Sequence, residues 1–470
     1  MNPSLITRIA LVSAVGVLSA PTSVAQTGVF TLIDAVREDR SGDVTRLLQA
    51  GVSVHAVQPD GGTALHWAVH RNNVEIASRL LAAGANADAA NELGVRPIAL
   101  ACTNGNTGMV RMLLVHGASA DAALPTGVTP LMTCARSGNS EAALHLLEHG
   151  ADVNAREAVR GQTALMWAVA ERHAHVVSTL IAAGADVQVR SDSGFTPLLF
   201  AAQQGDETSA RLLLDAGVDI NETGGDGSAA LLVATESGHA DMVQFLVDAG
   251  ANIDAVSAGR AALHAAVQHQ RPDIVALLLD LGAKPNMLLR EQLPRFAGDL
   301  SVTTGPGSMV GATPFWLAAK FTDVDLMRLL VDRGADPRLP SDDGTTPLMV
   351  AAGIGFLEGY DRYGRLLFND DTRRREQHDL EAVKLAFHLG GGIDVVNEHG
   401  QTVMHGAAYA GNDPVVRFLA EQGAALNSAD RTGLTPLAIT EGLYVSGTFL
   451  ARETTGTLLR DLGAVEGERR

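Results

Sequence analysis

Apolar residues recur along the chain in pairs of short clusters, and the pairs follow one another at a nearly constant interval. In each pair the first cluster ends in Ala-Ala or Ala-Val, a polar turn follows, and the second cluster places apolar residues at helical spacing. Apolar residues three and four positions apart share one face of an α-helix, so every pair predicts two short helices packed together. A polar stretch such as Gly-Ala-Asp-Val-Asn-Ala then predicts a hairpin that leads to the next pair.

The start of each first helix is marked by a capping residue in a fixed column. A threonine hydroxyl satisfies free N–H groups at a helix start, and the proline that often follows suits the first turn because its φ is fixed. The spacing within the column is 33 in most cases, with two longer spacings of 52 and 56. The column consists of Thr63, Arg96, Thr129, Thr163, Thr196, Ala229, Ala261, Thr313, Thr346, Thr402 and Thr435.

The end of each second helix is marked by glycine. Glycine accepts the left-handed backbone conformation that terminates a helix, because it has no Cβ atom to clash. These glycines follow apolar runs such as Arg-Leu-Leu-Ala-Ala and predict a helix end in every repeat. The column consists of Gly51, Gly84, Gly117, Gly150, Gly184, Gly217, Gly250, Gly282, Gly334, Gly390 and Gly423.

A fixed period of this length predicts a solenoid of stacked helix pairs. About twelve repeats fit between residues 29 and 465, beginning near residues 29, 62, 95, 128, 162, 195, 228, 260, 312, 345, 401 and 434. Two insertions interrupt the period. We expect the first, near 284–311, to lengthen a hairpin, and the second, near 355–379, to form a long loop between the two helices of the tenth repeat.

The segments Thr-Ala-Leu-His-Trp-Ala-Val (63–69), Thr-Pro-Leu-Leu-Phe-Ala-Ala (196–202) and Ala-Ala-Leu-His-Ala-Ala-Val (261–267) resemble the signature of the ankyrin repeat. The resemblance implies an all-α, ankyrin-repeat solenoid with short β-hairpin loops. It also implies structural hydrogen bonds between repeats for His66, His264 and His405. The runs at 311–320, 345–355 and 405–411 further resemble a group of exported (periplasmic) bacterial ankyrin-repeat domain-containing proteins.

Residues 1–25 have the pattern of a secretory signal peptide. Arg8 follows a short polar start, residues 9–20 are apolar, and Ser23 and Ala25 are the small residues that a signal peptidase requires. An uncleaved anchor or a lipid-free amphipathic start is the alternative, although the apolar run is shorter than the roughly 20 residues that span a bilayer. We therefore expect a periplasmic or secreted solenoid over 26–470, monomeric and without membrane insertion after signal cleavage.

Composition narrows the classes of partner. The net charge is −18, from 35 Lys and Arg against 53 Asp and Glu. Nucleic-acid binding normally requires a basic face that displaces counterions from phosphates, so this balance argues against a nucleic-acid partner. Aromatic residues make up 4% of the chain, so we expect a core filled mainly by Ala, Leu and Val.

The two cysteines, Cys102 and Cys134, fall in adjacent repeats, one position out of register. An oxidising compartment would favour a disulfide between them. Adjacent helices, however, pack about 8–10 Å apart, whereas a disulfide requires Cα atoms within about 7 Å. We therefore expect two buried, unbonded cysteines in positions where other repeats carry alanine.

No sequence pattern argues for catalysis or for a cofactor. His145, Glu148 and His149 match the H-x-x-E-H motif of inverted zinc proteases, but the register places them at the end of a second helix. His173 and His175 lack the third ligand that zinc requires. We therefore expect no metal site, no cofactor and no enzyme activity.

The family resemblance implies that a partner protein contacts the ends of the first helices and the hairpin tips, along a concave groove. The strip is polar and mixed in charge, and a solvated face without a partner is the alternative for part of it. By position, the residues are His70, Arg71, Thr103, Asn104, Arg136, Glu171, Gln203, Gln204, Glu236, Gln268, His269, Lys320, Phe321 and Tyr409.

The second insertion adds four further candidates, Tyr360, Arg362, Tyr363 and Arg365. Tyrosine and arginine are enriched among the residues that anchor protein interfaces. A flap that covers the ends of the helices is the alternative role for this segment.

The sequence thus predicts a protein–protein interaction scaffold. A regulator or chaperone of a specific exported enzyme is the alternative, and an enzyme with its site in the insertions is a more distant one.

Overall fold

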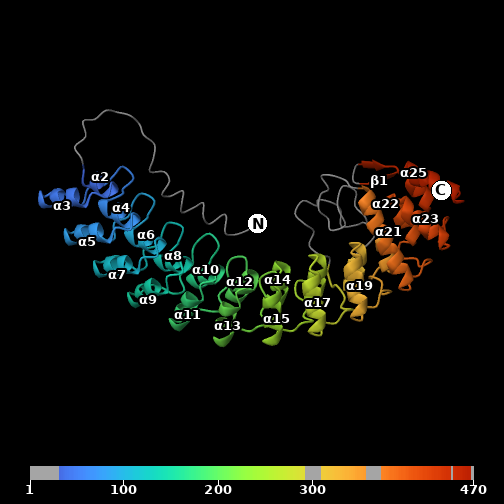
Figure 1. Cartoon of the computed structure of the whole chain (residues 1–470), viewed down its shortest axis with the longest axis horizontal. Coiled ribbons are helices and arrows are strands. Elements are labelled where there is room, and N and C mark those ends of the chain that lie inside the picture. Colours follow the sequence, from blue (N-terminus) through green and yellow to red (C-terminus); the bar gives the residue numbers. More distant parts are fainter. Residues whose placement is uncertain (1–30, 292–308, 356–371, 446–447, 467–470) are drawn as a thin grey trace, which may run out of the picture. The chain divides into compact units, whose positions relative to one another are not determined.

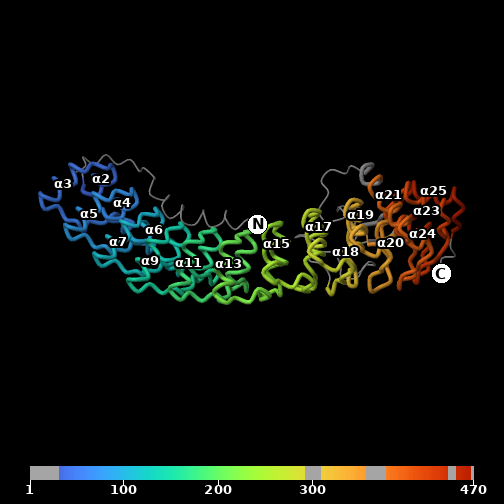
Figure 2. The backbone as a smooth tube through the Cα atoms, turned by 60° about the horizontal axis from the view of Figure 1, so that its bottom comes forward, coloured from blue at the N-terminus to red at the C-terminus, as the bar shows by residue number. Residues whose placement is uncertain are grey.

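The computed structural model describes residues 31–291, 309–355, 372–445 and 448–466. The chain divides into two compact units, unit 1 ending at Asp219 and unit 2 beginning at Ile220. Within each unit, the first helices of the repeats lie in one row and the second helices in another (Figures 1 and 2). Each helix contacts its partner in the same repeat and its counterparts in neighbouring repeats. The predicted all-α solenoid is confirmed.

The described part of unit 1 contains six helix pairs. The first helices are α2 (Leu32–Arg37), α4 (Ala64–His70), α6 (Pro97–Thr103), α8 (Pro130–Arg136), α10 (Ala164–Ala170) and α12 (Pro197–Gln204). The second helices are α3 (Ser41–Gln49), α5 (Val74–Ala82), α7 (Thr107–Val115), α9 (Ser140–Glu148), α11 (Ala174–Ala182) and α13 (Glu207–Asp215).

The described part of unit 2 contains six more pairs and a short β-hairpin. The first helices are α14 (Ala230–Ser237), α16 (Ala262–Gln268), α18 (Pro314–Lys320), α20 (Pro347–Ala352), α22 (Val403–Ala410) and α24 (Pro436–Thr440). The second helices are α15 (Ala240–Asp248), α17 (Pro272–Asp280), α19 (Val324–Asp332), α21 (Thr372–His388), α23 (Asp413–Glu421) and α25 (Glu453–Asp461). Strands β1 (Leu443–Val445) and β2 (Thr448–Leu450) pair antiparallel between α24 and α25.

The predicted helix boundaries are present in the structure. The Thr129 hydroxyl accepts a hydrogen bond from the Met132 N–H at 3.2 Å, and Pro130 occupies the first turn of α8. Gly84 follows α5 with a φ of 89°, a left-handed conformation that favours glycine. The core between the two rows is made largely of fully buried Ala, Leu and Val side chains, as expected.

Successive hairpins are tied together by a repeating hydrogen bond. An Asn or Asp side chain in one hairpin accepts from a backbone N–H in the next, as from Asp152 N to Asp121 Oδ1 at 2.8 Å and from Asp186 N to Asn154 Oδ1 at 2.8 Å. Backbone pairs add to this, for example Glu92 N to Asp60 O at 2.9 Å. We call this series the hairpin ladder, and it fixes the register of each repeat on its neighbour.

The three histidines of the repeat signature link repeats, as the family resemblance implied. His66 Nδ1 accepts from the Thr63 N–H at 3.2 Å, which leaves the proton on Nε2, 3.0 Å from the Val95 carbonyl. His264 and His405 make the same contacts with the carbonyls of Met287 and Leu434, at 2.9 Å and 3.2 Å. Trp316 takes the same place in α18 and donates from Nε1 to the Thr345 carbonyl at 2.8 Å.

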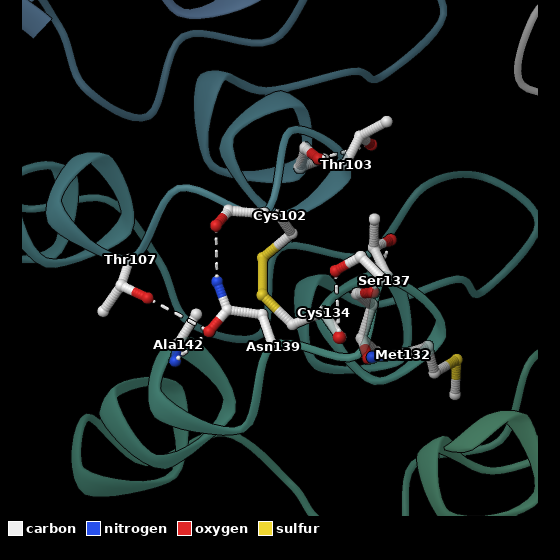
Figure 3. Close-up of a disulfide and its surroundings, with 12 residues drawn as sticks. Cys102, Thr103, Thr107, Met132, Cys134, Ser137, Asn139 and Ala142 are labelled. Carbon is white, nitrogen blue, oxygen red and sulfur yellow. Dashed lines mark hydrogen bonds between the residues drawn. A yellow bond between two sulfur atoms is a disulfide. The ribbon is translucent and has the colours of Figure 1, made fainter. Parts of the chain in front are cut away.

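The expectation of two unbonded cysteines is wrong. Cys102 in α6 and Cys134 in α8 form a disulfide with a Cα to Cα distance of 4.6 Å (Figure 3). The prediction treated the distance between helix axes as the distance between Cα atoms. Each Cα lies about 2.3 Å from its helix axis, so on facing sides of helices about 9 Å apart the Cα atoms are only about 4.4 Å apart.

The loop formed by the second insertion is shorter than predicted. Helix α21 begins at Thr372, inside the predicted loop, and has 17 residues, whereas α19 has 9. The inserted sequence Thr-Arg-Arg-Arg-Glu-Gln consists mainly of residues with good helix propensity, so it extends the second helix of the tenth repeat. The residues between Gly355 and Thr372 lie outside the described part of the chain.

Asp206, at the start of a second helix, is a cap with an unsatisfied oxygen. In α9 the cap is Asn139, which accepts from the Ala142 N–H and donates through Nδ2 to the Gly105 carbonyl of the preceding repeat at 2.8 Å. Asp206 caps α13 at the same position, but its buried Oδ2 has no hydrogen-bond partner among the described residues. An aspartate has no N–H to donate across the repeats.

We expect Asp206→Asn to raise the free energy of unfolding by about 1 kcal/mol, because the amide can donate to the carbonyl of the preceding repeat. The converse change, Asn139→Asp, should lower it, since the Gly105 carbonyl loses its donor. Urea unfolding followed by circular dichroism would measure both. A destabilised Asp206→Asn protein would contradict this interpretation of the cap.

Candidate functional site

The predicted contact residues of unit 1 lie together at the ends of the first helices, and we call this surface the strip. His70 and Arg71 end α4, Thr103 and Asn104 end α6, and Arg136 ends α8. Glu171 caps the end of α10, and Gln203 and Gln204 end α12. His70, Arg71, Thr103, Asn104 and Glu171 are exposed, whereas Arg136, Gln203 and Gln204 are half-buried.

The candidates in unit 2 are less accessible. Gln268 and Phe321 are both only 8% exposed, so they offer little surface to a partner. Glu236, His269, Lys320 and Tyr409 are half-buried, and they also lie at or near the ends of first helices. The Glu236 carboxylate is bound by Arg260, whose Nε donates to Oε1 at 3.1 Å. Unit 1 therefore presents the more open part of the predicted strip.

Hydrogen bonds to the preceding repeat hold the strip in place. Arg71 donates from Nη2 to the Arg37 carbonyl at 2.9 Å, and Asn104 donates from Nδ2 to the Val69 carbonyl at 2.7 Å. The His173 ring contacts the Arg136 carbonyl through Nε2 at 3.1 Å. Each of these bonds fixes the end of one first helix to the next repeat in the row.

The disulfide lies directly beneath the middle of the strip. Cys102 precedes Thr103 in α6, and Cys134 lies two residues before Arg136 in α8, and both cysteines are fully buried. Asn139 lies beside the disulfide in Figure 3 and joins the same two repeats through its bond to the Gly105 carbonyl. A covalent bond and a polar bond thus fix the relative positions of α6 and α8.

One pair in the strip joins a cation to an aromatic ring. The Arg136 guanidinium lies 5.2 Å from the centre of the Trp167 ring in the next repeat, a distance at which the two attract. Burial lowers the pKa of Arg136, and the nearby Glu171 carboxylate acts in the opposite direction. The repeat pattern in the sequence did not single out Trp167.

Burial also affects two histidines among the predicted contact residues, one in each unit. It lowers the pKa of His70, and the Arg71 guanidinium lowers it further. For His269 burial is again the largest cause of a lowered pKa, opposed by Glu236 and assisted by Arg260 and Arg271. Both rings are therefore mainly neutral at pH 7 and act as polar rather than charged contacts.

The histidines that suggested a metal site make local contacts instead. His145 Nδ1 lies 3.0 Å from Glu148 Oε2, and His149 Nδ1 bonds to the His145 carbonyl at 2.8 Å. Nowhere in the described ranges do three or more His, Cys, Asp or Glu side chains gather in a way that could hold a metal ion. Among the helices described, none is long and apolar enough to cross a membrane.

The candidates of the second insertion, Tyr360, Arg362, Tyr363 and Arg365, lie outside the described residues. The insertion begins beside the end of α18, because Lys320 Nζ donates to the Gly355 carbonyl at 3.3 Å. Its role as an interface or as a flap stays a prediction.

A row of helix pairs joined by short hairpins, with a polar strip on the ends of the first helices, defines a repeat protein of the solenoid class. Models of ankyrin repeats match residues 32–123, 79–157, 131–224, 198–288 and 374–440, and a single-repeat model matches residues 310–342. The chain belongs to the ankyrin repeat family. Ankyrin repeats form protein–protein interaction domains, so a protein is the class of partner that this family membership supports.

Similar proteins share the repeats over part of their length. The mouse protein "Ankyrin repeat and SOCS box protein 16" is 32% identical over 204 residues, which cover 39% of this chain and 41% of that protein. The rice protein "BTB/POZ domain and ankyrin repeat-containing protein NH5.2" is 36% identical over 93 residues, 20% of this chain and 15% of that protein. The chain therefore spans less than half the length of these relatives.

Proposed function

We propose that this protein is an exported interaction scaffold that binds a partner protein along the strip of unit 1. The main support is that exposed polar side chains at the ends of α4 and α6 are held by hydrogen bonds to the preceding repeats. A surface that is already ordered loses less conformational entropy when it binds, which favours affinity. The ankyrin family membership supports the same class of function.

Export is part of the proposal. Its support is the signal-peptide pattern of residues 1–25 together with the disulfide between Cys102 and Cys134. Disulfides persist in oxidising compartments such as the periplasm or the extracellular space and are rare in the cytosol. The intact mass of the protein from the exported fraction should correspond to a chain that begins at Gln26 and contains one disulfide. A reduced chain that retains Met1 would contradict export.

The scaffold proposal is tested by crosslinking in the exported fraction, followed by reconstitution of the recovered complex. Thr103→Glu places a negative charge on the strip. Ser78→Glu places the same charge at an exposed position of α5, in the row of second helices. We expect roughly tenfold weaker binding for Thr103→Glu, equivalent to about 1.4 kcal/mol, and none of this loss for Ser78→Glu. Equal binding by both variants would place the interface elsewhere.

The same experiment addresses the narrower role of a regulator or chaperone. If the partner is one exported enzyme, its activity or folding yield should change when the parent protein is added. Thr103→Glu should reduce that change in proportion to the loss of binding.

A further inference from the structure

Two neighbouring donor groups on the strip have no acceptor in the described part of the chain. Arg136 contacts the Trp167 ring, but its guanidinium makes no hydrogen bond or ion pair with any described residue. The Nε1 atom of Trp167 is buried and has no hydrogen-bond partner among the described residues, and the residue as a whole is 8% exposed. An unpaired buried donor is costly, and a half-buried unpaired cation adds to that cost.

Comparison with Trp67 shows why the indole of Trp167 lacks an acceptor. Trp67 holds the same position in α4, and its Nε1 donates to Gln58 Oε1 in the adjacent hairpin at 2.8 Å. In the hairpin before Trp167, Glu157 occupies the position that corresponds to Gln58. The backbone bonds show this, since Gln58 N bonds to Gly62 O and Glu157 N bonds to Gln162 O.

Glu157 is not available to Trp167. Its carboxylate accepts from the backbone N–H groups of Val159 at 2.7 Å, Arg160 at 2.8 Å and Gln162 at 3.1 Å within its own hairpin. The chain therefore supplies an internal acceptor for one tryptophan of the signature and leaves the other without one, directly beside an unpaired arginine.

The two unpaired donors define the chemistry of a group that could satisfy them. It must accept hydrogen bonds from both donors and carry negative charge, because burial disfavours the unpaired Arg136 cation and lowers its pKa. The guanidinium presents its N–H groups as a planar fork that matches the two oxygens of a carboxylate. Glu171 lies near Arg136 but forms no ion pair with it.

We propose that Arg136 and Trp167 together bind a carboxylate side chain, of glutamate or aspartate, on the partner protein. This inference rests on the proposed function and names the partner chemistry at the middle of the strip. A peptide segment is the occupant because polar groups continue along the strip on both sides, with Thr103 and Asn104 in one direction and Gln203 in the other.

The test uses the full chain from residue 26 and an array of acetylated, amidated decapeptides. Each peptide has one central glutamate and is paired with the same sequence carrying glutamine. We expect bound peptides to prefer glutamate by about 10- to 100-fold, the range for hydrogen bonds to charged groups. Arg136→Gln should abolish the preference, and Trp167→Phe, which keeps the ring but removes the N–H, should reduce it about tenfold.

Two matched variants control for charge and for loss of an indole donor. Arg111→Gln removes an exposed arginine from α7, and Trp67→Phe removes an indole whose donor already has an acceptor. Both should retain the glutamate preference. Thermal unfolding of each variant shows whether it is folded. Arg136→Lys keeps the positive charge but not the planar fork of N–H groups, so a folded Arg136→Lys protein should still lose most of the glutamate preference.

Several results of the array experiment would overturn the inference. The inference is wrong if peptides with glutamate and with glutamine bind equally, or if the array captures no peptide. It is also wrong if the glutamate preference is unchanged in Arg136→Gln and Trp167→Phe. The scaffold proposal would survive each of these if the Thr103→Glu experiment still weakened the recovered complex. Complete displacement of the peptides by millimolar acetate would assign the site to small carboxylates instead of a protein.

Glu171→Gln gives an independent check, because it removes a carboxylate whose charge acts on Arg136. We expect the variant to bind the glutamate peptides more tightly than the parent. Weaker binding would mean that Glu171 holds a cationic ligand, and it would overturn the proposal.

Discussion

Replacing Cys102 and Cys134 together by alanine should lower the free energy of unfolding by about 3–4 kcal/mol. The disulfide joins residues 32 apart, and a crosslink closing a loop of that length removes about this much conformational freedom from the unfolded chain. Alanine fits both sites, because the other repeats carry small residues such as Ala68 and Ala135 at the equivalent buried positions. Urea unfolding of the oxidised parent and the double variant would measure the difference.

The single variants provide the control for this prediction. Either Cys102→Ala or Cys134→Ala alone opens the crosslink, so each should cost nearly as much as the double change. Two independent thiols would instead give small losses that add. Additive losses of less than about 1 kcal/mol each would contradict a disulfide in the folded protein.

Acidification from pH 7 towards pH 4 should destabilise the region around His264 by about 3 kcal/mol, since each tenfold change in proton affinity corresponds to about 1.4 kcal/mol. Burial lowers the pKa of His264 to about 4 from the ordinary 6.5, partly offset by its bond to the Met287 carbonyl. Between these two pKa values the unfolded chain binds the extra proton and the folded chain does not. Stability therefore falls as the pH falls from 6.5 towards 4.

His264→Met isolates this contribution, because Met132 and Met166 occupy the same position in other repeats. The variant should be less stable than the parent at pH 7, since the bond to Met287 is lost, but the difference should shrink as the pH approaches 4. Urea unfolding at several pH values would show this convergence. His55→Gln, which removes an imidazole at an exposed site, serves as the control. A difference between His264→Met and the parent that stays constant with pH would contradict the assignment.

Local sequence signals were sufficient to predict where most of the helices begin and end. The threonine before each first helix and the glycine after each second helix act through short-range hydrogen bonds and backbone conformation, so they can be recognised without knowing the fold. The strip could be placed for the same reason, because its residues follow from the ends of the first helices. Its accessibility could not, since the burial of Gln268 and Phe321 depends on how neighbouring repeats pack.

The Arg136 and Trp167 pair could not be found from the repeat pattern alone. The Trp167 indole lacks the acceptor that Trp67 has because of its hairpin, where Glu157 bonds to its own backbone instead of to the ring. The signal in the sequence is the change from Gln58 to Glu157. Recognising it requires the hydrogen-bond register of a hairpin that is one residue longer than the earlier one.

The disulfide also changes how the protein responds to tension. In a solenoid pulled from its ends, repeats can detach one after another, and each repeat of 33 residues lengthens the chain by about 110 Å at roughly 3.3 Å per residue. The segment from Cys102 to Cys134 is closed by the crosslink and cannot extend. The contour length of the fully unfolded chain should therefore be shorter than its residue count predicts, by about the length of one repeat. Adding a reductant after unit 1 has unfolded should release this remaining length as a separate extension step.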